Sequence, residues 1–430
     1  MQIRGFRGWR FAGADGDVSG HIAPPYDILS AQQKQALLDV CSLNVVAIDL
    51  PHVPPKDAGP DEVYARAAKQ LAQWQTAGVL IRDNKPSIYV YDQTYTWAGR
   101  SYTRRAILAG VWATRLGADQ DIVPHEHTFA GPKADRLKLT RATRMQLSPI
   151  LGFCHDPSGE VASLLASRTS REPDAWGELA SVGEKLWVVS EQAVIDHLAA
   201  ALAETPAFIA DGHHRYTTAM NYRDELKAAG KIDDDHEANF VLFALVERDC
   251  EGLLVLPTHR LVDGLSGGFS LDKLCEAAEG FKWQEVDSAG ADLSDADSFL
   301  ARYGEHAMAF AAGDGGKLRI GRLIDEEVME SAVPDHCRAW RELDVAILQT
   351  LIMDGALKPF KTGKTEVSYT PDGNEALEAV RSGKAQLAVV MQGTPASAVE
   401  AVALAGEVMP HKSTYFYPKL STGMVLKPLE

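Results

Sequence analysis

The chain has 430 residues, of which 46% are hydrophobic and 24% are charged, and its formal net charge at pH 7 is −16. This composition allows a sizeable core and excludes wholesale disorder. The length favours two or three packed domains over one. An acidic surface repels phosphate backbones, so sequence-independent binding of nucleic acid is disfavoured.

The five cysteines lie far apart in the sequence, at positions 41, 154, 250, 275 and 337. An odd number of distant cysteines forms no disulfide framework, and we expect free thiols in a reducing compartment. The first residues lack the apolar core of a signal peptide, and no run approaches the ~18 apolar residues of a membrane span. These features predict a cytoplasmic protein without membrane contact, and a homo-oligomer is compatible with them.

Short strand-like and helix-like segments alternate along the first half of the chain. An apolar run at 44–50 predicts a buried strand, and apolar residues at helical spacing predict a helix at 61–78. Aromatic and β-branched residues at 87–97 and 102–112 flank an Ala-Gly-Arg turn and predict a hairpin. Further predicted elements are strands at 185–189 and 207–210, a helix at 191–203, and a pair of strands at 239–246 and 253–256.

Beyond about residue 265 the composition of the sequence changes. Helices are predicted at 338–354, 374–381 and 395–405, and strands at 307–311, 366–369 and 386–391. The alternation indicates a mixed α/β fold with several layers and mixed sheets. We predict an N-terminal domain over 1–265 and a C-terminal domain over 266–430, whose final segment (409–425) returns to the functional site.

The sharpest local signal is the sequence PAFIADGHHRYTTAM at 206–220. An apolar strand runs into Asp211 and Gly212, and a helix is predicted to begin near His213. A strand, a tight glycine turn and a helix start gather backbone N–H groups and the positive end of the helix dipole. Asp211 is expected to cap the helix. Arg215 offers a planar guanidinium that can donate two parallel hydrogen bonds to a phosphate or carboxylate. Histidines such as His213 and His214 ordinarily titrate near neutral pH. The alternative is a plain helix start with solvated histidines and a structural arginine.

A second polar cluster, PHEHTFAGPKADR, occupies 124–136 and is predicted to be a loop because of its Gly-Pro pair. A loop dense in acid, base and cation suits the wall or lid of an active site. Glu126 is the candidate general base, His125 a further catalytic candidate, and Lys133 and Arg136 are candidate phosphate ligands. The alternative is a solvated loop of ordinary polar composition.

The third cluster, MPHKSTYFYPKLSTGMV, occupies 409–425. Lys412, Ser413, Thr414, Tyr415 and Lys419 place cations and hydroxyls among aromatic residues, a combination that suits a phosphorylated ligand. The alternative is an edge strand protected by lysines. Two shorter fragments, at 22–30 and 256–262, add further candidates. These are Asp27, Thr258, His259 and Arg260.

Two tempting motif matches fail. The GKT at 363–365 lacks the glycine that a phosphate-binding loop needs five residues before Gly363, because Lys358 stands there. His125 with His127, and Asp211 with His213 and His214, could bind a metal, but their spacing does not enforce it. Adjacent helical residues point about 100° apart. The identity of any bound metal therefore stays open.

Several long fragments resemble one family across nearly the whole chain. They are APPYD at 23–27, HEHT at 125–128, GPKADR at 131–136, DGHHRY at 211–216, LPTHR at 256–260 and KSTYFYPKL at 412–420. The chain is identified by them as a member of the family catalogued as domain of unknown function 1015. The DGHHR segment also resembles the phosphate-binding turn of the ParB/sulfiredoxin superfamily, which includes free serine kinases.

These resemblances imply that Gly212, His213, His214 and Arg215 contact phosphates, and that an acid such as Glu126 or Asp27 activates a hydroxyl. We expect an enzyme that uses ATP or ADP and Mg²⁺ and transfers a phosphoryl group to or from a small hydroxylated metabolite such as serine. His125, Glu126, Asp211 and His213 are the catalytic candidates. Two alternatives stay open: a metal-dependent phosphohydrolase, for example on phosphoserine, and a non-catalytic nucleotide-binding regulator.

Overall fold

The computed structural model describes residues 1–55, 57–126, 128, 130–288, 291–313 and 316–430. The chain divides into two units. Unit 1 comprises Met1–Leu253 together with Pro418–Glu430, and unit 2 comprises Leu254–Tyr417. Unit 2 is therefore inserted in the sequence of unit 1, and the last residues of the chain complete unit 1. The predicted domain limits, 1–265 and 266–430, stay a prediction.

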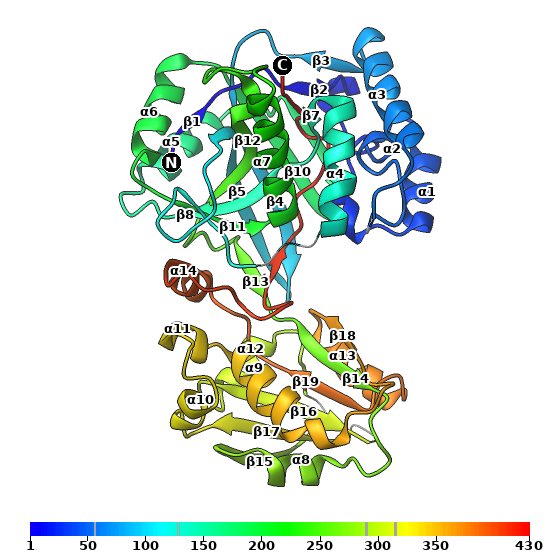
Figure 1. Ribbon diagram of the computed structural model, residues 1–430, viewed down its shortest axis with the longest axis vertical. Helices are drawn as coiled ribbons and strands as arrows, with labels where there is room; N and C mark the ends of the chain where they lie inside the picture. The colour runs from blue at the N-terminus through cyan, green and yellow to red at the C-terminus, as the bar shows by residue number, and fades with distance from the viewer. Residues whose placement is uncertain (56, 127, 129, 289–290, 314–315) are drawn as a thin grey trace. The chain divides into compact units, whose positions relative to one another are not determined.

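A nine-stranded mixed sheet lies at the centre of unit 1 (Figure 1). Its strand order is β6-β11-β8-β12-β5-β4-β10-β9, with β1 beside β5. The pairs β6–β11 and β8–β12 are parallel, and β11–β8, β12–β5 and β5–β4 are antiparallel. The strands are β1 (Ile3–Arg4), β4 (Ile88–Trp97), β5 (Arg100–Trp112), β6 (Ile122–Val123), β8 (Ile150–Cys154), β9 (Ala175–Leu179), β10 (Val182–Val189), β11 (Ala207–Asp211) and β12 (Phe240–Glu247).

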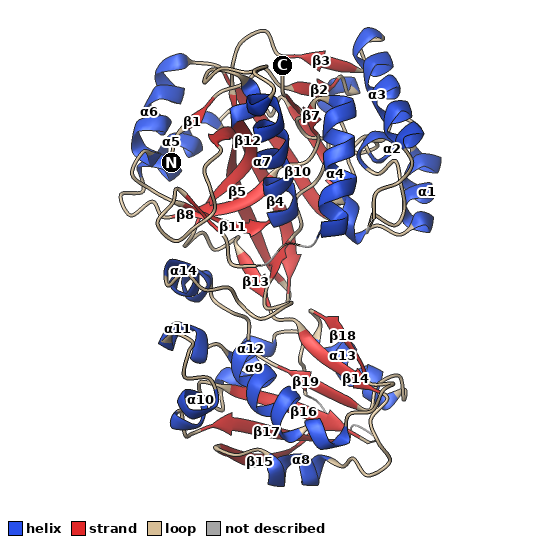
Figure 2. Cartoon of the chain, in the orientation of Figure 1, coloured by secondary structure: helices blue, strands red, loops and turns tan. Residues whose placement is uncertain are grey.

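The described part of unit 1 contains seven α-helices (Figure 2). They are α1 (Ala31–Val40), α2 (Val46–Asp49), α3 (Asp61–Thr76), α4 (Ala130–Thr143), α5 (Glu160–Arg168), α6 (Gln192–Leu202) and α7 (His213–Ala228). Helix α4 packs between α3 and α7. Two short ribbons complete the unit: β2 (Trp9–Phe11) with β3 (Leu80–Arg82), and β7 (Met145–Gln146) with β21 (Lys427–Pro428).

The core of unit 1 explains why these segments form a layered structure. Strand β12, with the sequence FVLFALVE, is buried except at its last residue, as a strand covered on both faces must be. Alternate residues of β12 and β5 share one apolar cluster with α5, α6 and α7. Burying such apolar surface is the main term that stabilises the fold.

Unit 2 is built on a six-stranded antiparallel sheet of order β15-β17-β16-β19-β14-β18. These strands are β14 (His259–Asp263), β15 (Phe281–Asp287), β16 (Ala307–Ala312), β17 (Lys317–Leu323), β18 (Glu366–Thr370) and β19 (Leu387–Val390). Its helices are α8 (Leu271–Ala277), α9 (Ala296–Ala301), α10 (Glu327–Ala332), α11 (Arg338–Arg341), α12 (Asp344–Ile347), α13 (Gly373–Arg381) and α14 (Ala396–Leu404). A separate ribbon pairs β13 (Leu254–Leu256) with β20 (Tyr415–Tyr417).

The mixed α/β class with mixed and antiparallel sheets is confirmed. The predicted helices at 61–78 and 191–203 are α3 and α6, and the predicted hairpin is β4–β5. Ala98 and Gly99 both have positive φ at its turn, as two-residue hairpin turns favour. In the part of the chain that the structure describes, no helix combines the length and the apolarity needed to cross a bilayer.

The predicted strand at 44–50 is wrong, since α2 is a four-residue helix there. The side chain of Asn44 accepts a hydrogen bond from the Val46 N–H at 3.0 Å and donates to the carbonyls of Gly20 and Ile22. These distant partners fix a helical turn that a short apolar run cannot distinguish from a strand.

The 124–136 segment is only in part a loop, because α4 begins at Ala130 and carries Lys133 and Arg136. Pro132 lies in the first turn of α4, where backbone N–H groups have no helical acceptor in any case, so proline is tolerated. The predicted pairing of 239–246 with 253–256 is also wrong: β12 pairs with β5 and β8, and β13 pairs with β20. The predicted helix at 338–354 is divided into α11, α12 and a π-helix at Leu348–Ala356.

Candidate functional site

The candidate site begins where β11 turns into α7. Residues Ala207–Ala210 are buried, and the register of β11 against β8 shifts between Ile209 and Asp211. Gly212 then turns the chain with a φ of +105° and a ψ of 25°. A Cβ atom at this position would lie 3.1 Å from the guanidinium carbon of Arg215. The backbone conformation therefore favours glycine, and any larger residue would also force the guanidinium of Arg215 to shift.

Gly212 is the N-cap of α7, and no side chain caps the helix. The predicted capping role of Asp211 is therefore wrong. The first N–H groups of a helix have no acceptor within the helix, and the helix dipole adds positive potential at the same place. Such a helix start suits an anionic group, above all a phosphate.

Asp211 instead forms two ion pairs. Its carboxylate lies 3.0 Å from Nη2 of Arg215 and 3.5 Å from Nζ of Lys419, and its side chain is 21% exposed. Burial by itself raises the pKa of Asp211, but Lys419 and Arg215 together lower it to about 2. A carboxylate with so low a pKa is a weak base near neutral pH, which argues against Asp211 as the general base.

The side chain of Arg215 stabilises the turn through two hydrogen bonds. One Nη donates to the carbonyl of Pro149, which directly precedes β8, and the other donates to Asp211 at 3.0 Å. The side chain is 10% exposed. A guanidinium has five N–H donors, so these two contacts leave donors to spare for a ligand at the turn.

His125 and His213 form a buried pair behind the turn, with ring centroids 4.7 Å apart and ring planes at 83°. Nδ1 of His125 lies 2.7 Å from the carbonyl of Ile209, which can only accept, so Nδ1 carries the proton. The backbone N–H of His125 donates to Nε2 of His213 at 3.3 Å. Burial lowers the pKa of both imidazoles, which keeps them neutral at pH 7.

Glu126 lies on the solvent side of this pair. Because Nε2 of His213 accepts a hydrogen bond, Nδ1 carries the proton and points toward Oε2 of Glu126, 3.9 Å away. Glu126 is 36% exposed, whereas His213 is 3% exposed. A ligand can therefore reach the carboxylate but not the imidazole, which argues against His213 as a residue that contacts substrate.

His214 faces a different environment from His213, as neighbours on a helix must. Its side chain is half-buried, and burial lowers its pKa, opposed by the charges of Glu126 and Asp27. The positive charge of Lys133, on α4, also lowers the pKa of His214. Nζ of Lys133 donates a hydrogen bond to Oγ1 of Thr128 at 3.3 Å. The exposed side of the turn thus gathers two carboxylates, an imidazole and a lysine.

Arg136 does not face this group. It is 5% exposed and donates to Asp135 at 2.7 Å and to the carbonyl of Asp49 at 2.6 Å. Its guanidinium also lies 3.9 Å above the ring of Tyr26. These contacts join α4 to α2 and to the segment before α1, so the predicted phosphate-binding residue Arg136 is committed to protein partners.

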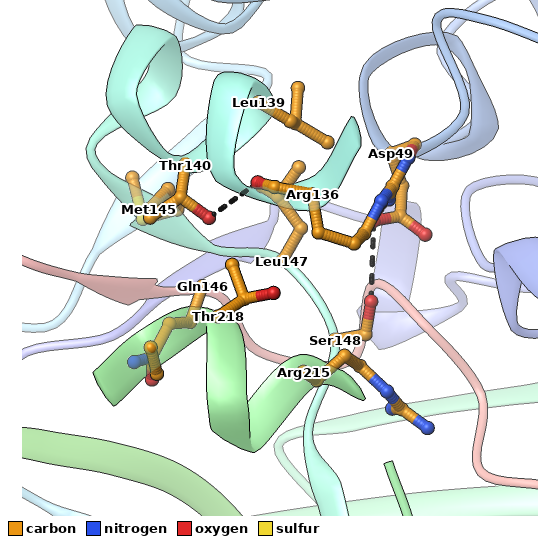
Figure 3. Close-up of a pocket in the computed structure, with 11 residues that line it drawn as sticks. Asp49, Arg136, Leu139, Thr140, Met145, Gln146, Leu147, Ser148, Arg215 and Thr218 are labelled. Atoms are coloured by element: carbon orange, nitrogen blue, oxygen red, sulfur yellow. Dashed lines mark hydrogen bonds and ion pairs between the residues drawn. The ribbon is translucent and has the colours of Figure 1, made fainter. Parts of the chain in front are cut away.

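A small cavity lies behind the turn, between α4 and α7 (Figure 3). Its volume is about 50 Å³, and Arg136, Arg215, Asp49 and Ser148 are among the residues around it. Drug-sized ligands occupy roughly 300–1,000 Å³, so this cavity can hold only a few water molecules. The buried Oγ1 of Thr218 has no protein hydrogen-bond partner and would gain one from such a water.

Lys419 comes to the site from the end of the chain. Gln93 donates to the Lys419 carbonyl at 3.1 Å, and Arg104 donates to the Pro418 carbonyl at 2.6 Å. Glu184 accepts from Gln93 and from Ser421. This buried network of β4, β5 and β10 residues fixes the backbone on either side of Lys419.

The remaining predicted site residues belong to unit 2. Thr258 and Arg260 both donate to the carbonyl of Lys412, whose φ is +57°. His259 is buried and accepts from the Met391 N–H at 3.2 Å; burial lowers its pKa to about 3. The fragments around 258–260 and 412–415 thus meet within unit 2, where β13 pairs with β20. Ser413 is buried there, and Thr414 and Tyr415 are half-buried.

Sequence reasoning missed several residues that build the site. Asp49, Ser148, Gln93, Arg104 and Glu184 act through contacts with residues distant in the sequence. The one available signal was a charged or amide residue inside an otherwise apolar segment, as Asp49 is in NVVAIDL. His127, also among the metal candidates, lies outside the described residues.

Three solved structures illustrate what the chain is similar to. One is a free serine kinase in complex with AMP (14% identity, 73% of this chain and 92% of that chain, TM-score 0.35). Another is a conserved hypothetical protein from Pyrococcus furiosus (16% identity, 73% and 95%, TM-score 0.32). The third is a C-terminally truncated SbnI from Staphylococcus aureus (15% identity, 75% and 87%, TM-score 0.34).

A search among curated proteins finds no match. A family of proteins of unknown function, DUF1015, matches residues 3–346, a span that includes β11, the Gly212 turn, α4 and the Thr258–Arg260 fragment. Because the match covers most of the chain, this protein belongs to the DUF1015 family.

Proposed function

We propose that unit 1 binds the phosphate of a small phosphorylated molecule at the N-terminus of α7 and transfers a phosphoryl group to or from a hydroxyl. The observation that carries the proposal is Gly212, whose φ of +105° exposes the start of a 16-residue helix directly after a buried strand. Backbone N–H groups at such a turn cradle an anion without the desolvation cost of bringing in another charge.

The side chains around the turn support phosphoryl transfer. This reaction needs little covalent chemistry from the protein but needs cations and donors around the phosphate and a base near the hydroxyl. Arg215 and Lys419 supply positive charge beside Asp211. Glu126, partly exposed and with Oε2 3.9 Å from Nδ1 of neutral His213, is the candidate base.

A nucleotide and Mg²⁺ fit this arrangement as co-reactants. Mg²⁺ prefers carboxylate oxygen and phosphate ligands. Burial lowers the pKa of His214, and the carboxylates of Glu126 and Asp27, at the exposed side of the turn, both act to raise it. When bound, the ion would neutralise charge on the phosphates. Serine is the proposed acceptor, on the resemblance to the superfamily that includes free serine kinases; the ParB/sulfiredoxin character of the turn stays a prediction.

A ligand panel tests the proposal. Thermal unfolding of the full chain is followed with ATP, ADP, CTP and phosphoserine, each with and without Mg²⁺. A ligand that binds only the folded state raises the unfolding temperature. Stabilisation by at least one phosphorylated ligand, and none by adenosine alone, is expected. The absence of any shift at millimolar ligand would overturn the proposal.

Arg215→Lys tests the site itself. The substitution keeps the charge but replaces a planar fork with a point charge, so affinity for the ligand should fall by about 1–3 kcal/mol. Arg141→Lys is the matched control, since Arg141 pairs with Glu225 of α7 but is 51% exposed and lies on the last turn of α4. Calorimetry that finds equal affinities for the two folded variants would remove Arg215 from the site.

The products of turnover separate the alternatives. Transfer to serine supports a kinase, and release of inorganic phosphate from phosphoserine supports a phosphohydrolase. Tight binding with neither product supports a nucleotide-binding regulator.

A further inference from the structure

A second polar group lies at the opposite edge of the large sheet of unit 1. Strands β8 and β12 are parallel, with Cys154 opposite Glu247. His155 follows the end of β8, and Asp249 follows the end of β12 by two residues. The Gly212 turn lies at the other edge, because β11 is antiparallel to β8 and Asp211 pairs with Leu151 at the start of β8.

The three side chains converge at one point. One ligand atom from each of His155, Glu247 and Asp249 lies within 4.8 Å of the other two. Nδ1 of His155 is 3.9 Å from Oε1 of Glu247 and 3.7 Å from Oδ2 of Asp249. These separations are too long for hydrogen bonds. Nδ1 is nevertheless a buried atom without a hydrogen-bond partner, and such an atom is costly unless something else satisfies it.

An open cavity of about 610 Å³ lies against the same residues. Its wall includes His155, Glu247, Asp249 and the start of α5 at Gly159 and Ala162. Cavities at the carboxyl ends of parallel strands are where α/β sheets most often bind ligands. The volume is sufficient for an ion with its water ligands and a small molecule beside it.

The charges near this point favour a cation. Glu247 and Asp249 each bring a carboxylate oxygen to within 4 Å of Nδ1 of His155. Arg248 donates to both oxygens of Asp249, at 2.8 Å and 2.7 Å, and offsets one negative charge. Each carboxylate oxygen has a second lone pair, so Asp249 can still coordinate an ion. Asp156, also in the wall, adds a further negative charge.

We propose that His155, Glu247 and Asp249 bind a divalent transition-metal ion, with Zn²⁺ as the best fit. Zn²⁺ takes nitrogen and carboxylate ligands at about 2.0–2.2 Å in tetrahedral geometry, which places neighbouring ligand atoms roughly 3.3–3.6 Å apart. Shifts of less than about 1 Å would bring the three atoms to that spacing. Three protein ligands leave a fourth position open toward the cavity, the pattern of a catalytic or ligand-binding zinc rather than a structural one. The nitrogen ligand argues against Mg²⁺ and Ca²⁺.

Calorimetry on the chelator-treated full chain tests this site. One equivalent of Zn²⁺ should bind, Mg²⁺ should not compete, and His155→Ala should lower Zn²⁺ affinity by about 100-fold or more, since even outer partners of metal ligands are worth 10–100-fold. His197→Ala is the matched control, because His197 is a partly exposed histidine (51%, against 40% for His155) paired with one acid, Glu160. It should leave the affinity unchanged. Thermal unfolding without metal shows that each variant is folded.

Co²⁺ absorption provides a second readout that separates this site from cysteine. Cobalt bound by nitrogen and oxygen gives visible bands without the thiolate charge-transfer band, and these bands should be lost in His155→Ala and in Asp249→Asn. Three results would overturn the proposal: no stoichiometric Zn²⁺ binding, equal Zn²⁺ affinity in His155→Ala, or a thiolate band in the wild-type protein. None of them bears on the phosphate site at Gly212.

Discussion

At the scale of single residues, Gly212 determines whether α7 can begin where it does. Gly230, at the other end of α7, also has positive φ, but its value of +62° is one that other residues adopt at modest cost. A Cβ atom at Gly230 would meet nothing within 4 Å, whereas one at Gly212 would press on Arg215. Gly230 is therefore a suitable control for Gly212, because the two glycines lie at opposite ends of the same helix.

Gly212→Ala should lower both the stability of the fold and affinity for the phosphorylated ligand. A non-glycine residue at this φ is strained by about 1–3 kcal/mol, and the displaced Arg215 would disturb the turn. Gly230→Ala should cost about 1 kcal/mol and leave affinity unchanged. Chemical denaturation gives the stability and calorimetry gives the affinity. Equal ligand affinity in the two variants would show that the turn does not bind the ligand.

Glu126→Gln should keep the fold and the ligand affinity but reduce turnover by roughly 10²–10⁴, the usual value of a positioned general base. If Glu126 instead binds Mg²⁺, the variant should need far more Mg²⁺ and recover part of its rate when supplied with it. A titration of rate against Mg²⁺ distinguishes the two roles. Glu225→Gln, which removes a solvent-exposed carboxylate from α7, is the control. Curves for Glu126→Gln that coincide with wild type would exclude any catalytic role.

At the scale of elements, the sequence was informative wherever an element follows from its own residues. Helix α3 has apolar residues at helical spacing over 16 residues, and the β4–β5 hairpin has its turn residues in place. Helix α2 has four residues and depends on hydrogen bonds from Asn44 to Gly20 and Ile22, so its own sequence could not identify it. The Gly-Pro pair at 131–132 was misleading because proline is equally suited to a loop and to a first helical turn.

The C-terminal segment, like α2, makes a contact that its own sequence could not predict. Lys419 was predicted as a ligand residue, but nothing local indicates that it would reach Asp211, more than 200 residues earlier in the chain. The contact depends on Gln93 and Arg104, which bind the backbone at Lys419 and Pro418. The ion pair between Lys419 and Asp211 depends on how unit 1 folds, whereas the turn at 211–215 can be predicted from consecutive residues.

Lys419→Met should destabilise the fold by about 1 kcal/mol at pH 7, since it removes one of two cations that hold the pKa of Asp211 at about 2. The lowered pKa means that the ionised carboxylate stabilises the folded state above its usual pKa of 3.8. That contribution is lost as the pH falls from 3.8 toward 2. The difference in stability between wild type and variant should therefore shrink across this window.

Denaturation at a series of pH values measures this difference. Lys138→Met is the control: Lys138 pairs with Asp61 at 2.6 Å, but Asp61 is 85% exposed, and exposed pairs contribute little. The difference between wild type and this control should be small at every pH. A Lys419→Met difference that did not change between pH 5 and pH 2 would contradict the assigned ion pair.

At the scale of the whole molecule, the motifs that looked like one site in the sequence are distributed over two units. The 125–136 and 211–216 fragments and Lys419 lie in unit 1, whereas Thr258, Arg260 and Lys412 contact one another in unit 2. Unit 2 lies between residues 253 and 418 of unit 1 in the sequence. That the whole 409–425 segment returns to the functional site stays a prediction. Sequence spacing could not decide it, because spacing carries no information on which unit a returning segment joins.

Hydrogen exchange on the full chain tests the central claim most directly, with the phosphorylated ligand that gives the largest shift in the thermal panel. A ligand at the start of α7 should slow exchange in peptides covering 207–216 and 418–421, and in the 125–136 segment if it reaches Glu126. Slowed exchange at 411–415 as well would support convergence with unit 2. Protection confined to other segments, with unchanged exchange at 207–216, would contradict the claim that the Gly212 turn binds phosphate.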